Sequence, residues 1–102
     1  MALSVNVNNN EANGSWDVNV SGEIDLSNAH QFKEQLEDAL AEERQNICID
    51  LEKLNYIDST GLGVIIGVYG SIKKDGYHVK LLNPRDNVKK LLSISGLDKI
   101  LC

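Results

Sequence analysis

The chain is poor in cysteine, in long apolar runs and in basic clusters. Its two cysteines, Cys48 and Cys102, lack CxxC spacing, and no pair of histidines or cysteines has the spacing of metal ligands. These residues therefore favour neither a disulfide framework nor a metal site. No apolar run approaches the roughly 20 residues that a membrane-spanning helix needs. We expect a protein without a bound metal or cofactor and without membrane association.

Neither the start of the chain nor its charge favours export or nucleic-acid binding. The first residues lack the basic segment and following apolar segment of a secretion signal, which predicts a reduced, cytoplasmic protein. The 10 lysines and arginines stand against 15 aspartates and glutamates, so the formal net charge is −5. The basic pairs, Lys73-Lys74 and Lys89-Lys90, fall at expected helix ends. Because phosphate contacts need clustered basic side chains, we expect no binding to nucleic acid or anionic membrane.

Alternating strand-like segments and amphipathic segments predict a single α/β domain over residues 1–102. Apolar residues alternate with polar ones in two segments that flank Asn13-Gly14, a turn signal. Helix-like spacing follows, and Ser27 or Asn28 can cap that helix. The expected strands are about 2–8 and 15–22, then 47–51 and a strand that carries Tyr77, Val79 and Leu81. The capped helix carries its apolar face from Ala29 to Leu40, the next helix spans about 59–74, and the last, with Pro84 as a candidate first residue, ends at Ser95-Gly96. The tail after Gly96 is short and apolar, as in a last strand or turn.

The order β-β-α-β-α-β-α predicts a mixed sheet of about four strands. After the initial hairpin, the alternation of strands and helices favours parallel strands joined by right-handed crossovers. Helix N-termini then gather at the carboxyl ends of the strands. We therefore expect the segment around Asp25 to lie near the segment around Ser59.

Charge is absent from Ser59 to Ile72, although 25% of the chain is charged. An ordinary surface helix has a charged outer face. On a helical projection, three glycines share one strip: Gly63, Gly67 and Gly70. Since glycine in a helix interior costs roughly 1 kcal/mol relative to alanine, the strip needs a reason. Either the helix packs closely on its own sheet or on a neighbouring helix, or this face is left clear for a partner protein.

The start of this helix carries the candidate functional group. Asp58 or Ser59 can act as the N-cap, because a side-chain oxygen there accepts from a free amide of the first turn. A helix N-terminus also suits an anion. The Ser59 hydroxyl therefore lies where a phosphate would be well placed.

An enzymatic function remains an alternative at this stage. A Ser-His-Asp hydrolase would use Ser59 as the nucleophile, but Ile57 stands where the first glycine of a G-x-S-x-G turn belongs, and the possible bases are His30 and His78. The glycines after Thr60 do not match the dinucleotide pattern, and no P-loop is present. A small nucleotide-binding protein or hydrolase that uses Ser59 is the second hypothesis.

Three segments resemble landmarks of one known family. Asp58-Ser59-Thr60-Gly61-Leu62-Gly63-Val64, preceded by Leu54-Asn55-Tyr56-Ile57, resembles the signature of bacterial anti-sigma factor antagonists, which belong to the STAS domain family that sulfate transporters share. The stretch Gly22-Glu23-Ile24-Asp25, with Ala29 beyond it, resembles the second landmark. The stretch from Leu91 to Ile100 resembles the third, although many relatives continue into a further helix.

The resemblance implies a non-enzymatic partner switch in transcription regulation, with Ser59 as the phosphorylated residue and Thr60 as a less favoured acceptor. The unphosphorylated protein would bind an anti-sigma factor that is itself a serine kinase and so free the sigma factor. Phosphorylation would release the antagonist, and a serine phosphatase would reset it. The residues expected to bind the partner are Asp25, Asp58, Ser59, Thr60, Gly61, Leu62 and Gly63. The sequence leaves open whether stress response or sporulation lies downstream, or whether the domain serves another assembly.

Overall fold

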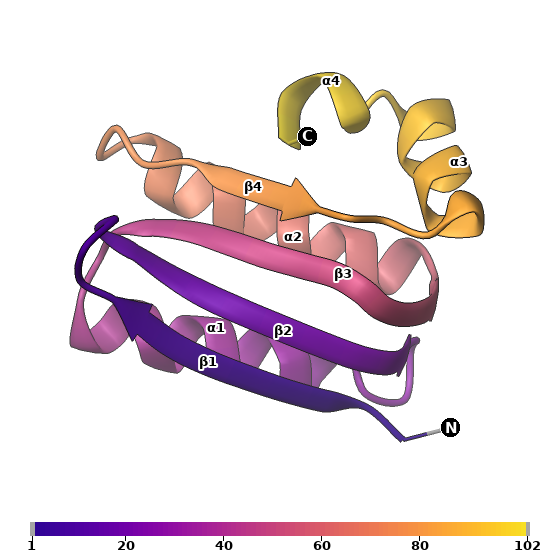
Figure 1. The fold of residues 1–102 in the computed structure, drawn as a ribbon, viewed down its shortest axis with the longest axis horizontal. Helices are drawn as coiled ribbons and strands as arrows, with labels where there is room; N and C mark the ends of the chain where they lie inside the picture. Colours follow the sequence, from indigo (N-terminus) through magenta and orange to yellow (C-terminus); the bar gives the residue numbers. More distant parts are fainter. Residues whose placement is uncertain (1, 102) are drawn as a thin grey trace.

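The structure, a computed structural model, describes residues 2–101 as a four-stranded mixed sheet with helices. Its elements are β1 (Ser4–Asn10), β2 (Ser15–Ile24), α1 (Ala29–Glu42), β3 (Asn46–Ile57), α2 (Ser59–Lys73), β4 (Val79–Leu82), α3 (Asp86–Ser95) and α4 (Asp98–Leu101). The strand order is β1-β2-β3-β4, with β1 antiparallel to β2 and the other pairs parallel (Figure 1). This confirms the predicted α/β architecture and the order of its elements, to which the structure adds the short helix α4.

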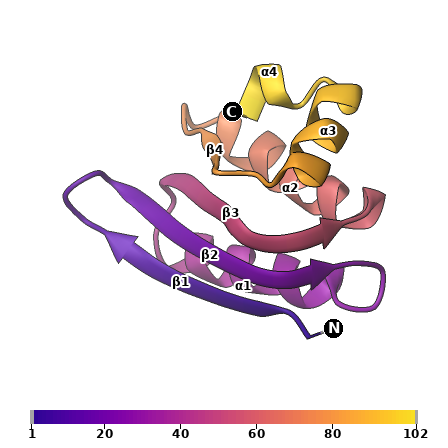
Figure 2. The ribbon, with the colours of Figure 1, turned by 45° about the vertical axis from the view of Figure 1, so that its right-hand side comes forward.

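The core lies between one face of the sheet and helices α1 and α2. Alternate residues of the central strands are buried there, for example Val18 on β2 and Ile49 on β3, each 1% exposed. Helices α1 and α2 lie on the same side of the sheet, whereas α3 and α4 lie at its β4 end (Figures 1 and 2). Phe32 and Leu36 of α1 and Ile65 of α2 are buried in the same cluster. The apolar spacing of both helices therefore reflects their burial against the sheet.

The main departure from the expected elements is the length of β3. The segment 52–57, expected as a connector, continues the strand to Ile57 because β2 runs beside it as far as Ile24. The pairing shifts register between Asn19 and Ser21 and again after Gly22. Gly22 has φ +95°, and a Cβ there would lie 2.0 Å from the carbonyl oxygen of Ala2. These irregularities interrupt the alternation that would otherwise mark the end of β3 in the sequence.

Two expectations about the C-terminal part are wrong. Pro84 is not the first helical residue, because α3 starts at Asp86 with Arg85 as its N-cap. The tail is helical rather than extended, since residues 98–101 form α4. Gly96 adopts the left-handed conformation (φ 77°), and the amide of Leu97 donates to the carbonyl of Leu92 at 3.0 Å. This cap turns the chain and buries Leu97, so the last residues begin a new helical turn.

Candidate functional site

The candidate site forms where β2 and β3 end side by side. Ile24 pairs with Ile57 in the parallel register, and the amide of Asp58 donates to the carbonyl of Ile24 at 3.1 Å. Asp25 and Asp58 therefore leave neighbouring strands at the same edge of the sheet. This is the proximity that the parallel topology predicts for the segments around Asp25 and Ser59.

Asp58 is the N-cap of α2. Its Oδ1 accepts hydrogen bonds from the amides of Thr60 at 2.9 Å and Gly61 at 3.2 Å, and also from the Thr60 hydroxyl. The Thr60 hydroxyl is the main cause of a lowered pKa for Asp58; the backbone amides of Gly61, Thr60 and Leu26 lower that pKa further, and partial desolvation opposes them. Asp58 is thus a carboxylate at neutral pH, held in place by the first turn of the helix.

Ser59 is the first residue of α2, and it is exposed. Among the described residues, its hydroxyl makes no hydrogen bond, so that group is free to meet a reactant from solvent. From its sequence, the start of this helix is expected to receive a phosphate on Ser59. The amides of Thr60 and Gly61, however, already donate to Asp58. A phosphoryl group on Ser59 would therefore receive its hydrogen bonds from water more than from these amides.

The residues that follow Ser59 divide into supporting and accessible positions. Gly61 and Leu62 are buried, so they support the site rather than present side chains to a partner. A Cβ on Gly61 would lie 2.6 Å from Cγ2 of Ile24 and 2.7 Å from Cγ1 of Ile57, which explains the glycine by close packing. Gly63 is exposed, and a Cβ there would have no described atom within 4 Å.

The glycine strip of α2 faces open space. Gly67 and Gly70 resemble Gly63 in that an added Cβ would meet no described atom within 4 Å. Close packing within the chain therefore does not account for these three glycines. The interpretation in which this face is left clear for a partner stays a prediction.

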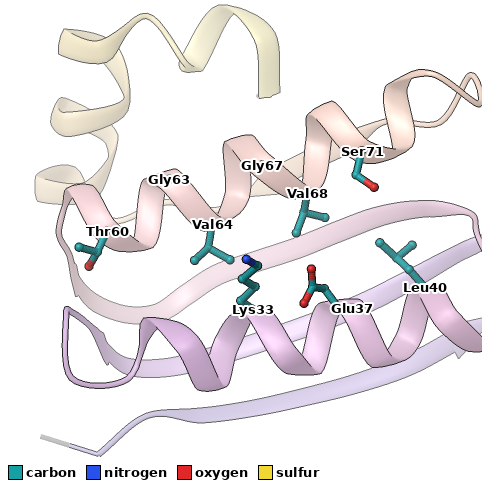
Figure 3. A pocket seen from close by; sticks show the side chains of 9 residues that line it. All are labelled: Lys33, Glu37, Leu40, Thr60, Gly63, Val64, Gly67, Val68 and Ser71. Atoms are coloured by element: carbon teal, nitrogen blue, oxygen red, sulfur yellow. The ribbon is translucent and has the colours of Figure 1, made fainter.

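A groove between α1 and α2 begins beside the candidate site. Figure 3 shows α1 side chains on one side and α2 residues on the other. The groove is lined by Lys33, Glu37, Leu40, Thr60, Gly63, Val64, Gly67, Val68 and Ser71. Thr60 adjoins Ser59 in the sequence, so the groove runs along α2 from the candidate site.

The loop between β2 and α1 is held by a compact set of hydrogen bonds. Asn28 Oδ1 accepts from the amide of Asp25 at 2.9 Å, and its Nδ2 donates to the carbonyl of Glu23 at 2.9 Å. The Asp25 carboxylate accepts from the amide of Ser27 at 2.9 Å and from its hydroxyl. Asn28 precedes α1, as expected, but its side chain makes no cap bond within the described chain; it braces the loop instead.

Leu26, in this loop, is a candidate functional residue that was not predicted from the sequence. Its side chain is 78% exposed, and it lies two residues after Ile24, whose carbonyl accepts from the amide of Asp58. A sequence signal could have identified it. Leu26 is an apolar residue between Asp25 and the expected helix cap, where it fits neither the alternation of a strand nor the spacing of a helix.

The hydrolase alternative finds no catalytic base beside Ser59. His30 lies on α1, where its Nε2 is 2.9 Å from Oε1 of Glu34. His78 is exposed immediately before β4, and in residues 2–101 neither histidine hydrogen-bonds Ser59. The same residues contain no group of three or more histidine, cysteine or acidic side chains that could hold a metal ion. In this part of the chain, no helix has both the length and the apolar character needed to cross a bilayer.

Comparisons with known proteins agree with the geometry. The chain matches the STAS domain over residues 6–101. It is 39% identical to the anti-sigma-B factor antagonist of Bacillus subtilis (strain 168), over 99% of this chain and 90% of that protein. Its fold is similar to that of the anti-sigma factor antagonist SpoIIAA in its unphosphorylated form, with a TM-score of 0.84 and 22% identity over 97% of this chain and 86% of that one.

A second solved structure extends the likeness to a phosphorylated protein. The Bacillus cell fate determinant SpoIIAA in its phosphorylated form has a TM-score of 0.75 to this chain and 21% identity, over 97% of this chain and 89% of that one. Both forms of SpoIIAA thus share the fold described above. Anti-sigma factor antagonists are regulators and not catalysts. By its sequence and its fold, the chain belongs to the STAS domain family, as an anti-sigma factor antagonist, and is not an enzyme.

Proposed function

We propose that phosphorylation of Ser59 switches this antagonist from a form that binds an anti-sigma factor to a form that does not. The observation that carries the proposal is the position of the Ser59 hydroxyl. Ser59 is exposed at the start of α2 and directly follows Asp58, whose carboxylate caps the helix. It lies at the edge of the sheet where Asp25 also leaves its strand. A kinase can reach this hydroxyl without unfolding the helix.

The proposed switch acts through charge. A phosphoryl group adds about −1.5 to −2 charges at neutral pH. On Ser59 that charge would lie next to the ionised Asp58 and near Asp25. Buried without a partner in an interface, it would be costly to desolvate. A thousandfold loss of affinity corresponds to only about 4 kcal/mol, which one desolvated phosphate can supply.

The fold should tolerate the modification because Ser59 is exposed and its hydroxyl makes no hydrogen bond among the described residues. The existence of a solved SpoIIAA structure in its phosphorylated form supports this expectation for the shared fold.

The proposed partners follow from the family. The unphosphorylated chain binds an anti-sigma factor that is also a serine kinase, and this binding frees a sigma factor. A serine phosphatase acts on phosphorylated Ser59 and restores binding. The name of the Bacillus subtilis relative, an anti-sigma-B factor antagonist, supports a role in the regulation of a sigma factor. We propose that the chain acts in the cytoplasm. The process controlled is the stress response or sporulation, the two alternatives that the sequence leaves open.

The proposal is tested by capturing the partner and following its release. The purified chain is immobilised, incubated with lysate of the source cell, washed, and then given ATP. We expect a kinase-related anti-sigma factor to be retained before ATP and released after it, with phosphate on Ser59 by mass spectrometry.

Two variants make this experiment specific. Ser59→Ala should retain the captured protein after ATP is added. Ser93→Ala is the matched control, because Ser93 is an exposed serine on α3 whose side chain makes no hydrogen bond in the described chain, and it should be released like the wild type. Complete phosphorylation of the Ser59→Ala variant, or release that does not depend on Ser59, would refute the assignment.

A further inference from the structure

We infer that Leu26 is the apolar anchor through which the unphosphorylated chain docks on its anti-sigma factor, in an apolar pocket of that protein. The inference rests on the proposed function and deepens it, because it names a contact that neither the signature segment nor the predicted set of partner residues contains.

The first observation is the exposure of the Leu26 side chain. At 78% it is the most exposed large apolar side chain among those described. The others are Ile94 at 75%, Tyr56 at 47% and Ile66 at 46%. Single exposed leucines are common on protein surfaces, so exposure alone does not make an anchor. It does show that Leu26 contributes little to the core.

The second observation is that the loop is ordered around this exposed residue. The residues on either side of Leu26 are fixed: Asp25 accepts from Ser27, and Asn28 bonds both the amide of Asp25 and the carbonyl of Glu23. Such bracing fixes the backbone that presents the leucine before any partner arrives. Because the loop needs little further ordering on binding, the entropic cost of docking Leu26 is low.

The third observation is the position of Leu26 beside the switch. Leu26 lies two residues after Ile24, whose carbonyl accepts from the amide of Asp58 at 3.1 Å, and Asp58 immediately precedes Ser59. An apolar side chain that enters a partner's pocket would therefore carry the Ser59 hydroxyl to the rim of that pocket. A phosphoryl group on Ser59 would then have to lose water at the same contact, which is unfavourable.

This arrangement makes the anchor and the switch parts of one contact. In the unphosphorylated chain, Leu26 fills the pocket and excludes water around Ser59. In the phosphorylated chain, the charge prevents the close approach that the leucine needs. The contribution of Leu26 should therefore appear only when Ser59 is uncharged, and substitutions at the two positions should be non-additive.

The test measures binding of purified chain variants to the purified anti-sigma factor by isothermal titration calorimetry. Leu26→Ala should weaken binding about thirtyfold, as expected for a buried anchor at an interface. Ile94→Ala is the matched control, since Ile94 is almost as exposed but lies on α3. It should change affinity less than twofold. Leu26→Met, which keeps the apolar volume, should bind within about fivefold of the wild type.

A double-variant measurement then tests the coupling to the switch. Leu26→Ala combined with Ser59→Asp should bind no more weakly than Ser59→Asp alone. Thermal unfolding of Leu26→Ala should match the wild type, which separates docking from folding. The inference is overturned if Leu26→Ala binds like Ile94→Ala while the wild type binds and is released by phosphorylation; the proposed function would then stand. If the wild type does not bind the anti-sigma factor at all, both the proposed function and this inference are wrong.

Discussion

Asp58 and Thr60 form a closed local unit at the start of α2, in which one carboxylate oxygen accepts from both the amide and the hydroxyl of the same threonine. This relationship lowers the pKa of Asp58 and occupies a donor that a bound anion would otherwise use. Asp58 therefore has a structural role at the helix start, and the neighbouring Ser59 is left free for modification.

The lowered pKa of Asp58 predicts a dependence of stability on pH. The ionised form is favoured in the folded chain, so its stabilising effect is present above the ordinary carboxyl pKa of 3.8 and is lost as the pH falls through the lower folded value. Asp58→Asn should be less stable than the wild type at pH 7, and the difference should shrink below about pH 3.8. Urea denaturation at a series of pH values measures this. An equal difference at pH 7 and pH 2.5 would contradict the assigned hydrogen bonds.

Ser59→Asp should fold like the wild type but lose binding to the anti-sigma factor. The exposed position tolerates the charge, so the thermal midpoint should shift by less than about 4 °C, which corresponds to roughly 1 kcal/mol or less. Affinity should fall by at least about a hundredfold, since a carboxylate carries less charge than a phosphate. Calorimetric titration and thermal unfolding of the same sample check both. Ser59→Ala, of similar stability, should keep wild-type affinity.

Gly61 and Gly63 should respond in opposite directions to the same substitution. Gly61→Ala places a Cβ 2.6 Å from the Ile24 side chain and should destabilise the chain by about 1–3 kcal/mol. Gly63→Ala places its Cβ in open space and should stabilise the helix by up to about 1 kcal/mol. Urea denaturation followed by circular dichroism compares the two variants. Destabilisation of both by similar amounts would show that the α2 face is more tightly packed than described.

Cys48 should react slowly with alkylating reagents near neutral pH. Burial raises the pKa of its thiol, and Asp17 adds to this effect while Lys80 opposes it. Because the thiolate is the reactive species, the alkylation rate should lie several-fold below that of a free cysteine at pH 7.5 and rise only at higher pH. Iodoacetamide labelling of the Cys102→Ser variant, followed by mass spectrometry, measures this rate. A rate equal to that of free cysteine would mean that the thiol is fully accessible.

The sequence predicted most of the architecture because its periodicities are regular. The change from strand spacing to helix spacing after Asp58 placed α2 almost to the residue, and the parallel crossover rule brought Asp25 toward Ser59. The far end of β3 was not predictable in the same way. Its pairing with β2 shifts register twice, and each shift places one extra residue on β3, which breaks the alternation of buried and exposed residues along β3.

The site itself was predictable only at the level of its segment. That Asp58 and Ser59 start a helix follows from capping preferences. Which of their neighbours face solvent depends on packing between strands that are distant in sequence. Gly61 and Gly63 differ by two positions and appear equivalent in the sequence, yet the first lies against Ile24 and Ile57 and the second against open space. Leu26 was missed because the exposure of a loop residue depends on the tertiary fold.

The occupied amides at the start of α2 have a consequence for how the proposed signal is carried. The amides of Thr60 and Gly61 already donate to Asp58, so they offer no free donors to a phosphate on Ser59. We therefore expect the backbone to keep its conformation when Ser59 is modified. The two forms would then share one shape and differ in surface charge alone. Removing the phosphate would restore the binding form at once, without a slow refolding step, so the pace of the response would be set by the enzymes that add and remove the group.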